Sequence, residues 1–459
     1  MKRDRAALVL GALGALVCLS VAELGGDPTP WKAQTARAHG VLGPLVRAAN
    51  GVWDPGLLRA IAVLGGVVVV LAWIAVLLIR DRRWRCGVVV AAAIAVTCAL
   101  VVPATLMQIG LRDGTAPWFY TNDSAYQIEL GGDLVLHGHS PYGRDYAHTG
   151  MERLYHLDGT PPNPGEQIVA LGHFPYFPGM ALFGAGARLL PSPFDDVRFL
   201  VMLCTLALLP AAMLLRGPFP VRLAIGAVLA ANPLSVRAAW FGTADAPAVL
   251  ALVLAFACMQ RRRYTGALAL IGAAVILKQF AIVALPFVLL EAWRDGGRRA
   301  LVRPLAALLA VVLVPSLVFA AGDPGAFWND TITFGASTYR VIGYGLAGIL
   351  VKAGIVDRTG SYPFPLIALL TWLPVTGALL WLQRRDRAPW MPAAGFAASM
   401  FMLVFIARVF QTSYLIYPLA GLCVAAVAAC WSPGASPPER RLDQPAAPTD
   451  ISAAPSSVR

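Results

Sequence analysis

The fold of this chain is decided by residues 117–146, which read PWFYTNDSAYQIELGGDLVLHGHSPYGRDY. The stretch is polar, aromatic and rich in carboxylates, yet it lies between apolar runs that end near Gly110 and resume at about Tyr176. The polar loop as a whole, residues 110–175, carries eight acidic residues against three arginines. We therefore expect it in water at a membrane surface, held there by the apolar runs on either side.

The composition defines the class of protein. Hydrophobic residues make up 58% of the 459 residues, charged residues make up 14%, and the mean hydropathy is +0.66. Soluble domains have roughly 45–50% apolar and about 25% charged residues. At roughly 20 residues per span, the chain predicts an all-α polytopic membrane protein with a bundle of about 12 transmembrane helices. Two extracytoplasmic loops are expected to carry short interfacial helices.

The distribution of charge predicts the orientation. The net charge is +12, but the basic residues form short clusters between the apolar runs, as in short cytoplasmic loops. Nucleic acid is not an expected partner, because it would need one contiguous basic face. The opening MKRDR and the apolar run after it are interpreted as an uncleaved first helix. We expect a multi-pass protein of the plasma membrane with both termini cytoplasmic and loop 110–175 outside. The basic clusters are Lys2 to Arg5, Arg80 to Arg85, Arg261 to Arg263, Arg294 to Arg299 and Arg384 to Arg387.

The alternation of inner and outer segments constrains individual runs. The run 176–190 contains three glycines and is not followed by basic residues, so it is the run predicted not to cross. Residues 264–277 and 280–293 have arginines at both outer flanks, which predicts a helical hairpin with its tip near Lys278. The predicted division is 1–109 (first three transmembrane helices), 110–175 (extracytoplasmic loop), 176–320 (central helix bundle), 321–360 (second extracytoplasmic loop), 361–431 (C-terminal helices) and 432–459 (disordered cytoplasmic tail).

Motifs for soluble cofactors are missing from the sequence. It has no GxxxxGK[ST], no HExxH, and no GxGxxG after a predicted strand, so a nucleotide site of the usual soluble type is not expected. The seven cysteines lie in or beside apolar runs without a CxxC, which indicates neither a disulfide framework nor a zinc site. Any activated substrate is expected to arrive through the membrane. We expect no cofactor, although His137-x-His139 leaves a divalent cation as an alternative.

Asp123 is the carboxylate with the clearest chemical interpretation. It follows Trp118, Phe119 and Tyr120, and aromatic residues are common at the bilayer edge. In one interpretation Asp123 is an ordinary loop carboxylate beside this interfacial belt. In the other it is a general base, since a carboxylate at the boundary of water and lipid can take a proton from an attacking hydroxyl. Residues 123–138 are predicted to form a short amphipathic helix on the membrane.

Lys278 is the most informative charge within the apolar runs. Ionisable residues in membrane segments are costly and point to function by default. One interpretation is that Lys278 snorkels to the interface at the tip of the hairpin, and the other is that its ammonium group binds a lipid-linked phosphate. Arg408 lies similarly at an external helix end, with Gln411 and Tyr414 close behind it. The other external charges near the membrane are Arg237, Asp245 and Arg340.

Five segments, in order along residues 110–430, resemble the motifs of GT-C glycosyltransferases that use polyprenyl-phosphate sugars. The likeness is to the branch of actinobacterial phosphatidylinositol-mannoside mannosyltransferases, with arabinofuranosyltransferases as relatives. The chain departs from the family pattern at Gln279, where proline is usual, and at Thr243, where glutamine is usual. The segments are DSAY (123–126) with GHSPY (138–142), HFPYFPGMALFGAGARLLP (173–191), NPLSVRAAWFGTADAPAVLAL (232–252), ILKQFAIVALPFVLL (276–290) and RVFQTSYLIYPLAG (408–421).

This resemblance implies a hexosyltransferase, and in particular a polyprenyl-phosphate-mannose-dependent mannosyltransferase. Its acceptor would be a glycolipid or a cell-wall glycan on the extracytoplasmic face. Asp123 would be the base of an inverting transfer, and Lys278, Arg408 and Arg340 would bind the donor phosphate. The alternatives are an arabinofuranosyltransferase, a lipid-linked-sugar flippase or transporter, and a non-catalytic membrane partner. The residues expected to bind substrate are Tyr126, His137, His139, Tyr142, His173, Asp245, Gln411 and Tyr414.

Overall fold

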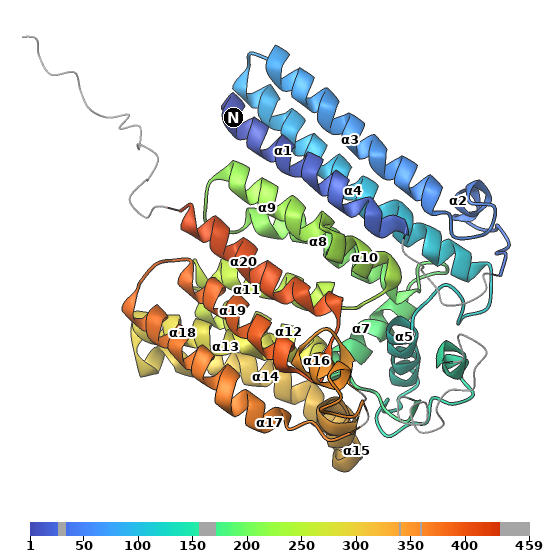
Figure 1. The fold of residues 1–459 in the computed structure, drawn as a ribbon, viewed down its shortest axis with the longest axis vertical. Coiled ribbons are helices and arrows are strands. Elements are labelled where there is room, and N and C mark those ends of the chain that lie inside the picture. The colour runs from blue at the N-terminus through green and yellow to red at the C-terminus, as the bar shows by residue number, and fades with distance from the viewer. Residues whose placement is uncertain (26–33, 156–170, 339–340, 359, 432–459) are drawn as a thin grey trace, which may run out of the picture.

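The computed structural model describes residues 1–25, 34–155, 171–338, 341–358 and 360–431. It is an all-α membrane protein, as predicted, and its long helices lie side by side in one bundle (Figure 1). Within these ranges the strands are β1 (Ile342–Gly343) and β2 (Val409–Phe410), which form one short parallel pair. The predicted tail 432–459 and Arg340 lie outside the described residues.

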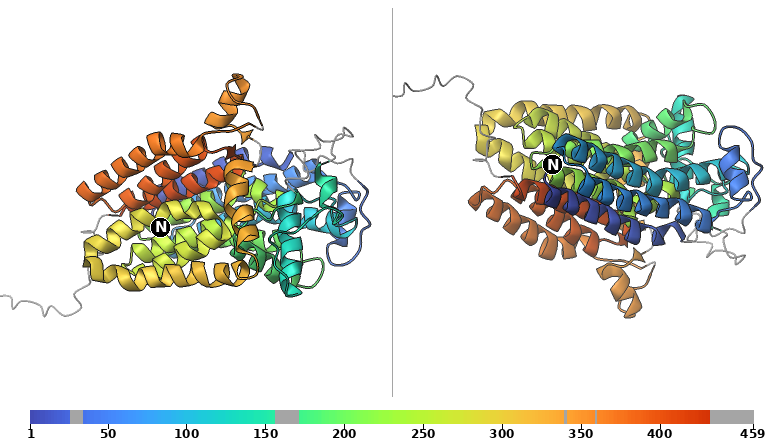
Figure 2. Two further views of the ribbon diagram at one scale, coloured as in Figure 1. Left: turned by 90° about the horizontal axis from the view of Figure 1, so that it is seen from below. Right: turned by 90° about the horizontal axis from the view of Figure 1, so that it is seen from above.

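The first three long helices form a layer on one side of the bundle (Figures 1 and 2). They correspond to the three spans predicted before the acidic loop. Carboxylates fix where two of them begin, because the side chain of Asp54 accepts the backbone N–H of Leu57 and that of Asp81 accepts the N–H of Arg83. The helices are α1 (Arg3–Ser20), α3 (Pro55–Leu78) and α4 (Arg82–Asp113), with the short η1 (Ala22–Gly25) and α2 (Gly43–Ala48) between α1 and α3.

A break in the central helices bends the chain between α9 and α10. The chain bends by 41° between helices α9 (Phe219–Ala231) and α10 (Pro233–Phe241). Pro233 begins α10, and proline has no backbone N–H with which to continue the hydrogen-bond ladder of α9. The Asn232 side chain caps α10 by accepting two backbone N–H groups. Gly242, at φ 94°, ends α10 in the left-handed conformation that favours glycine. The neighbouring helices are α8 (Val197–Met213) and α11 (Ala246–Met259).

The predicted hairpin is confirmed. Helix α12 (Tyr264–Leu277) is followed by η3 (Gln279–Ala284) and α13 (Leu285–Gly296). The two outer ends lie together, because the Tyr264 hydroxyl donates to the carboxylate of Asp295. Lys278 stands at the tip with an extended backbone, φ −150° and ψ 113°, which interrupts the helix there.

The rest of the chain forms the two loops and the last helices of the bundle. In the first loop, α5 confirms the helix predicted at 123–138. In the second loop, η5 is π-helical; η6, which is also π-helical, lies beyond that loop among the C-terminal helices. The elements of the first loop are α5 (Asp123–Leu136) and η2 (Met151–Tyr155), and α7 (Pro178–Arg188) follows the loop; the later elements are η4 (Arg298–Leu301), α14 (Val302–Ala320), α15 (Pro324–Trp328), η5 (Asn329–Thr338), α16 (Leu346–Lys352), α17 (Phe364–Ile367), η6 (Ala368–Trp372), α18 (Leu373–Arg385), α19 (Met391–Ile406), η7 (Thr412–Leu415) and α20 (Ile416–Ala429).

The number of membrane spans differs from the prediction. In the described part of the chain, six helices are long and apolar enough to cross a membrane, or seven if α9 and α10 form one broken span. Four shorter apolar helices, α8, α11, α12 and α19, lie beside them. The protein is multi-pass, but the expected count of about 12 spans is not confirmed. Several apolar runs that were counted as spans fold into helices of 17 residues or fewer.

The bundle has a basic end and a site end. At the basic end, the amino group of Met1 donates to the carbonyl of Arg82, and the guanidinium group of Arg216 lies 5.3 Å from the ring of Trp431. The site end carries α5, the hairpin tip and the second loop (Figures 1 and 2). Helix α7 has 11 residues and packs on α5 at the site end, where Gly132 and Gly184 allow close backbone contact. The run 176–190 therefore does not cross the bundle, as predicted.

Candidate active site

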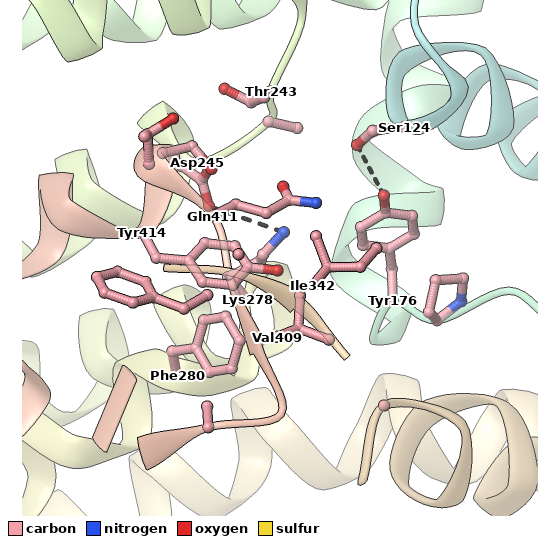
Figure 3. Close-up of a pocket in the computed structure, with 18 of the residues that line it drawn as sticks. Ser124, Tyr176, Thr243, Asp245, Lys278, Phe280, Ile342, Val409, Gln411 and Tyr414 are labelled. Atoms are coloured by element: carbon pink, nitrogen blue, oxygen red, sulfur yellow. Dashed lines mark hydrogen bonds and ion pairs between the residues drawn. The ribbon is translucent and has the colours of Figure 1, made fainter. Parts of the chain in front are cut away.

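A cavity of about 830 Å³ lies at the site end. Segments far apart in the sequence form its wall: the start of α5, the turn between α10 and α11, the hairpin tip, the second loop and the segment after α19 (Figure 3). Its volume is in the range of small-molecule sites in proteins. It brings together six of the predicted site residues: Asp123, Asp245, Lys278, Arg408, Gln411 and Tyr414.

Asp123 is the first residue of α5 and lies on the cavity wall. The start of this helix is fixed by Asn122, whose side chain accepts the N–H of Ala125 at 2.7 Å and donates to the carbonyl of Phe241 at 2.7 Å. One oxygen of Asp123 accepts the N–H of Ser124 at 2.8 Å. A helix N-terminus is the positive end of the helix dipole and favours negative charge. The fold therefore supports a carboxylate here, as a general base requires.

Lys278 is buried in the wall of the same cavity, with 9% of its surface exposed. Its Nζ lies 3.7 Å from Oδ1 of Asp245, and it also lies 5.2 Å and 5.6 Å from the ring centroids of Tyr176 and Tyr414. Asp245 is 1% exposed and accepts a hydrogen bond from the Tyr417 hydroxyl at 3.1 Å. Figure 3 shows Lys278 between the two tyrosine rings. The ammonium group is thus held in place with a loose ion pair, next to an open volume.

Arg408 reaches the cavity from the segment between α19 and β2. Its NH1 donates to the carbonyl of Gly360 at 2.9 Å, and burial lowers the pKa of this guanidinium group. Arginine nevertheless remains charged in proteins. The pairing of β1 with β2 holds the second loop against this segment. At the pair, Gly343 has φ 105°, and a Cβ there would lie 1.6 Å from the carbonyl oxygen of Phe410, so only glycine fits.

The β1–β2 pair also corrects one statement made from the sequence. Residues 343–348 read GYGLAG, which has the GxGxxG spacing and begins in a strand. A dinucleotide site needs this motif between a strand and a helix of a βαβ unit. Here each strand has two residues, the helix that follows is the seven-residue α16, and the first glycine fits against Phe410. This GxGxxG serves loop packing and does not form a nucleotide fold.

Three predicted substrate-binding residues lie in the first loop, outside the cavity wall. The Tyr126 hydroxyl donates to the carbonyl of Thr149 at 2.6 Å, and the Tyr142 hydroxyl donates to the carbonyl of Tyr176 at 2.9 Å. Burial raises the pKa of the Tyr142 hydroxyl far above its usual range. His173 Nδ1 lies 2.6 Å from Oδ1 of Asp330. All three side chains contribute to the packing of the loop that carries Asp123.

The two remaining predicted residues lie at the other end of α5. His137 and His139 are exposed and border a separate hollow of about 510 Å³. The 14 residues of α5 separate them from Asp123 by about 21 Å at 1.5 Å per residue. Across the residues that the structure describes, no three His, Cys, Asp or Glu side chains form a group that could hold a metal ion.

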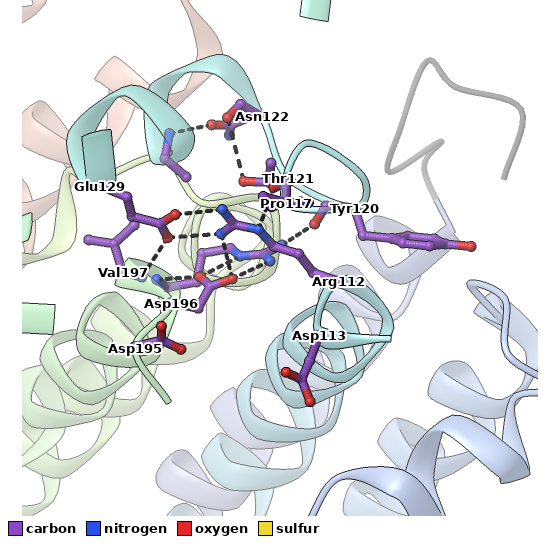
Figure 4. Close-up of polar contacts among 12 residues, drawn as sticks. Arg112, Asp113, Pro117, Tyr120, Thr121, Asn122, Glu129, Asp195, Asp196 and Val197 are labelled. Atoms are coloured by element: carbon purple, nitrogen blue, oxygen red, sulfur yellow. Dashed lines mark hydrogen bonds and ion pairs between the residues drawn. The ribbon is translucent and has the colours of Figure 1, made fainter. Parts of the chain in front are cut away.

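A buried ionic network that the sequence did not predict fixes α5 to the bundle (Figure 4). Arg112, near the end of α4, donates to Glu129 of α5 at 2.5 Å and 2.9 Å and to Asp196 at 2.8 Å. Arg198 donates to Asp196 at 2.6 Å and 2.9 Å and to the carbonyl of Tyr120 at 2.5 Å. We call these four side chains, Arg112, Glu129, Asp196 and Arg198, the ionic network.

The ionic network is closed to solvent and rich in hydrogen bonds. Arg198 is 0% exposed and Glu129 is 2% exposed. Burial by itself would raise the pKa of Asp196, but the guanidinium groups of Arg198 and Arg112 outweigh burial and hold this pKa well below its usual range. The backbone N–H of Val197 adds a bond to Glu129 at 2.9 Å. The network therefore positions the helix that presents Asp123.

Asp330 is a further residue that the sequence did not single out for a role. Its carboxylate accepts the N–H groups of Gly143 at 2.9 Å and Phe174 at 3.2 Å, in addition to its contact with His173. It is 2% exposed and belongs to η5, other residues of which line the cavity. Asp330 thus fastens the second loop to the first.

The comparison with known families agrees with this architecture. The sequence model of Glycosyltransferase family 87 (GT87) matches residues 174–407, just over half of the 459 residues. The chain therefore belongs to this family of GT-C-type membrane glycosyltransferases, which depend on polyprenyl-phosphate sugars. The resemblance inferred from the motifs is confirmed. No curated protein and no solved structure matches the chain. The matched range contains Asp245 and Lys278, whereas Asp123 precedes it.

Proposed function

We propose that this chain transfers a sugar from polyprenyl phosphate to a glycolipid or cell-wall glycan, on the extracytoplasmic face and with inversion. One observation carries the proposal: a single cavity joins the carboxylate of Asp123 to the cations Lys278 and Arg408. An acceptor hydroxyl and a lipid-linked phosphate need these two kinds of group on either side of the reacting carbon. Mannose is the preferred sugar, on the resemblance of the motifs to phosphatidylinositol-mannoside mannosyltransferases.

The proposed reaction is a single displacement. The acceptor oxygen attacks the anomeric carbon while Asp123 takes the proton of the acceptor hydroxyl. The bond from the anomeric carbon to the phosphate oxygen breaks on the opposite face, which inverts the configuration. The leaving phosphate gains negative charge, and Lys278 and Arg408 stabilise it. Asp245 holds Lys278 in position, and Gln411 and Tyr414 are placed to contact the sugar or the phosphate.

The orientation is part of the proposal. The basic clusters gather at the end of the bundle opposite to the cavity, which supports a cytoplasmic basic end and an extracytoplasmic site end. Cysteines introduced at residues 148 and 262 test it. An impermeant thiol reagent is expected to label position 148 in intact cells and to label position 262 only after lysis. The reverse pattern would mean that the cavity faces the cytoplasm, and it would refute the proposed extracytoplasmic site.

The function itself is tested with purified protein in liposomes. Polyprenyl-phosphate mannose and the corresponding arabinofuranose donor are supplied separately with membrane-extracted acceptors, and the glycosylated products are measured. We expect transfer from the mannose donor. Transfer from arabinofuranose alone would keep the class of reaction and change the sugar. Movement of either donor across the bilayer with no product would identify a flippase and refute the proposal.

A further inference from the structure

Tyr176 connects the two halves of the cavity. On one side its hydroxyl lies 2.7 Å from the hydroxyl of Ser124, the residue after Asp123. On the other side its ring centroid lies 5.2 Å from Nζ of Lys278. Figure 3 shows both relations, with Tyr176 between Ser124 and Lys278. A single side chain thus contacts the start of α5 and the cation at the hairpin tip.

The position of Tyr176 is itself fixed. Prolines precede it and follow Phe177, which restricts the backbone of the segment. The backbone carbonyl of Tyr176 accepts the hydroxyl of Tyr142, and its ring packs edge-on against Phe174 at 5.4 Å. The residue is 9% exposed. A ring held in this way can fix the position of one wall of the cavity relative to the other.

We propose that Tyr176 is a positioning residue that sets the separation between Asp123 and Lys278. This inference rests on the proposed function, in which Asp123 faces the acceptor and Lys278 faces the leaving phosphate. A displacement needs both groups at a defined distance from the anomeric carbon, and a misplacement of about 1 Å can cost on the order of 100-fold in rate. The hydroxyl of Tyr176 positions the base through Ser124, and the ring positions the cation.

The two halves of this role can be separated by substitution. Tyr176→Phe keeps the ring and removes the bond to Ser124, and Ser124→Ala removes the same bond from the other side. Each is expected to lower kcat about 10-fold and to leave the KM for the donor within about twofold, the scale of one lost hydrogen bond. The double variant is expected to match the single variants. Tyr176→Leu also removes the ring and is expected to raise the KM for the donor about 10-fold, the scale of a lost cation–π contact.

The measurement is steady-state transfer by the purified full-length protein, with donor and acceptor varied in turn. Multiplication of the Tyr176→Phe and Ser124→Ala effects in the double variant would overturn the proposal, because the two substitutions would then act through different contacts. So would wild-type kinetics for Tyr176→Leu. Tyr146→Phe is the matched control, since it removes a buried hydroxyl bonded to the Pro141 carbonyl in the same loop, and wild-type kcat is expected.

A binding experiment separates this inference from the proposed function. The affinity of each variant for a polyprenyl phosphate that carries no sugar is measured in detergent. We expect the wild type and Tyr176→Phe to bind equally and Tyr176→Leu to bind about 10-fold more weakly. Equal affinity of Tyr176→Phe and Tyr176→Leu would refute the role of the ring. Failure of the wild type to transfer any sugar would instead refute the proposed function.

Discussion

The site end contains two buried groups of charges that are built from similar residues and differ in how fully they are paired. In the ionic network, the carboxylates of Glu129 and Asp196 accept hydrogen bonds of 2.5 to 2.9 Å from Arg112 and Arg198. In the cavity, Lys278 lies 3.7 Å from Asp245, and the rings of Tyr176 and Tyr414 also lie near its ammonium group. Closely paired charges can hold a fold together, whereas a loosely paired cation beside a cavity can still bind an anion.

Removing one member of the ionic network should have the largest effect. Arg198→Met leaves Asp196 buried with fewer donors, and breaking a buried ion pair from one side costs about 3–5 kcal/mol. We expect a large fall in the free energy of unfolding and little folded protein, measured by thermal or denaturant unfolding in detergent. Arg188→Met is the control, because Arg188 pairs with Asp133 and Asp195 where these side chains are about 30–39% exposed. Equal free energies of unfolding for Arg198→Met and Arg188→Met would contradict the idea that the closely paired, buried charges hold the fold together.

Substitution of Asp123 should remove activity and leave the fold intact. Asp123→Asn keeps the size and the position of the side chain but cannot accept the proton, so kcat is expected to fall about 100- to 10,000-fold. The unfolding temperature should stay close to that of the wild type. Asp133→Asn is the matched control on the same helix, and near-normal transfer is expected because Asp133 pairs with Arg188 away from the cavity. Near-normal turnover of Asp123→Asn would show that Asp123 is not the general base.

Lys278→Met tests the cavity pair directly. If the ammonium group binds the donor phosphate, we expect affinity for polyprenyl phosphate to fall about 10- to 100-fold, the scale of a charge-assisted hydrogen bond. The loss of stability should be smaller than that of Arg198→Met, since the pair with Asp245 is longer. Unchanged donor affinity and rate would make Lys278 a structural residue. Asp245→Asn leaves the ammonium group of Lys278 in place, so it should weaken donor binding less than Lys278→Met does.

The smallest effect is expected at Asp330. Asp330→Asn keeps an oxygen for one backbone N–H and loses the negative charge beside His173, so the second loop should be held less firmly over the cavity. We expect the KM for the donor to rise roughly two- to tenfold, the scale of one or two hydrogen bonds, with kcat largely retained. Kinetics together with limited proteolysis of the second loop measure the change. A fall in kcat as large as that of Asp123→Asn would place Asp330 in the reaction itself.

Hydropathy and charge predicted much of this architecture, because both act locally along the chain. They gave the membrane class, the three helices before the acidic loop, the hairpin at Lys278 and the short α7 that does not cross. The motifs placed Asp123, Asp245, Lys278, Arg408, Gln411 and Tyr414 in one region, and the structure brings these residues to one cavity. Local patterns could not count the spans, because several apolar runs are short helices inside the bundle.

The remaining features depend on contacts between distant segments. Arg112 and Asp196 are separated by 84 positions, and no periodicity relates them. Tyr126, His137 and His139 follow Asp123 closely in sequence, but the helix points them to other surroundings. In the sequence Tyr176 stands out only as part of a motif, and its contacts with Ser124 and Lys278 join segments that are distant along the chain. Sequence proximity to a catalytic candidate was therefore a poor guide to membership of the site.

The hairpin of α12 and α13 has a consequence for how the protein is made. Its first leg, α12, has 14 residues, or about 21 Å at 1.5 Å per residue, against a hydrocarbon core of about 30 Å, whereas the second leg adds the six residues of η3 to the 12 residues of α13. The first leg is short for a span that inserts alone, so we expect the two legs to enter the membrane as one unit during synthesis. We therefore expect the Lys278 ammonium group to reach the cavity only after both legs have been made, which would make assembly of the cavity a late event in biogenesis.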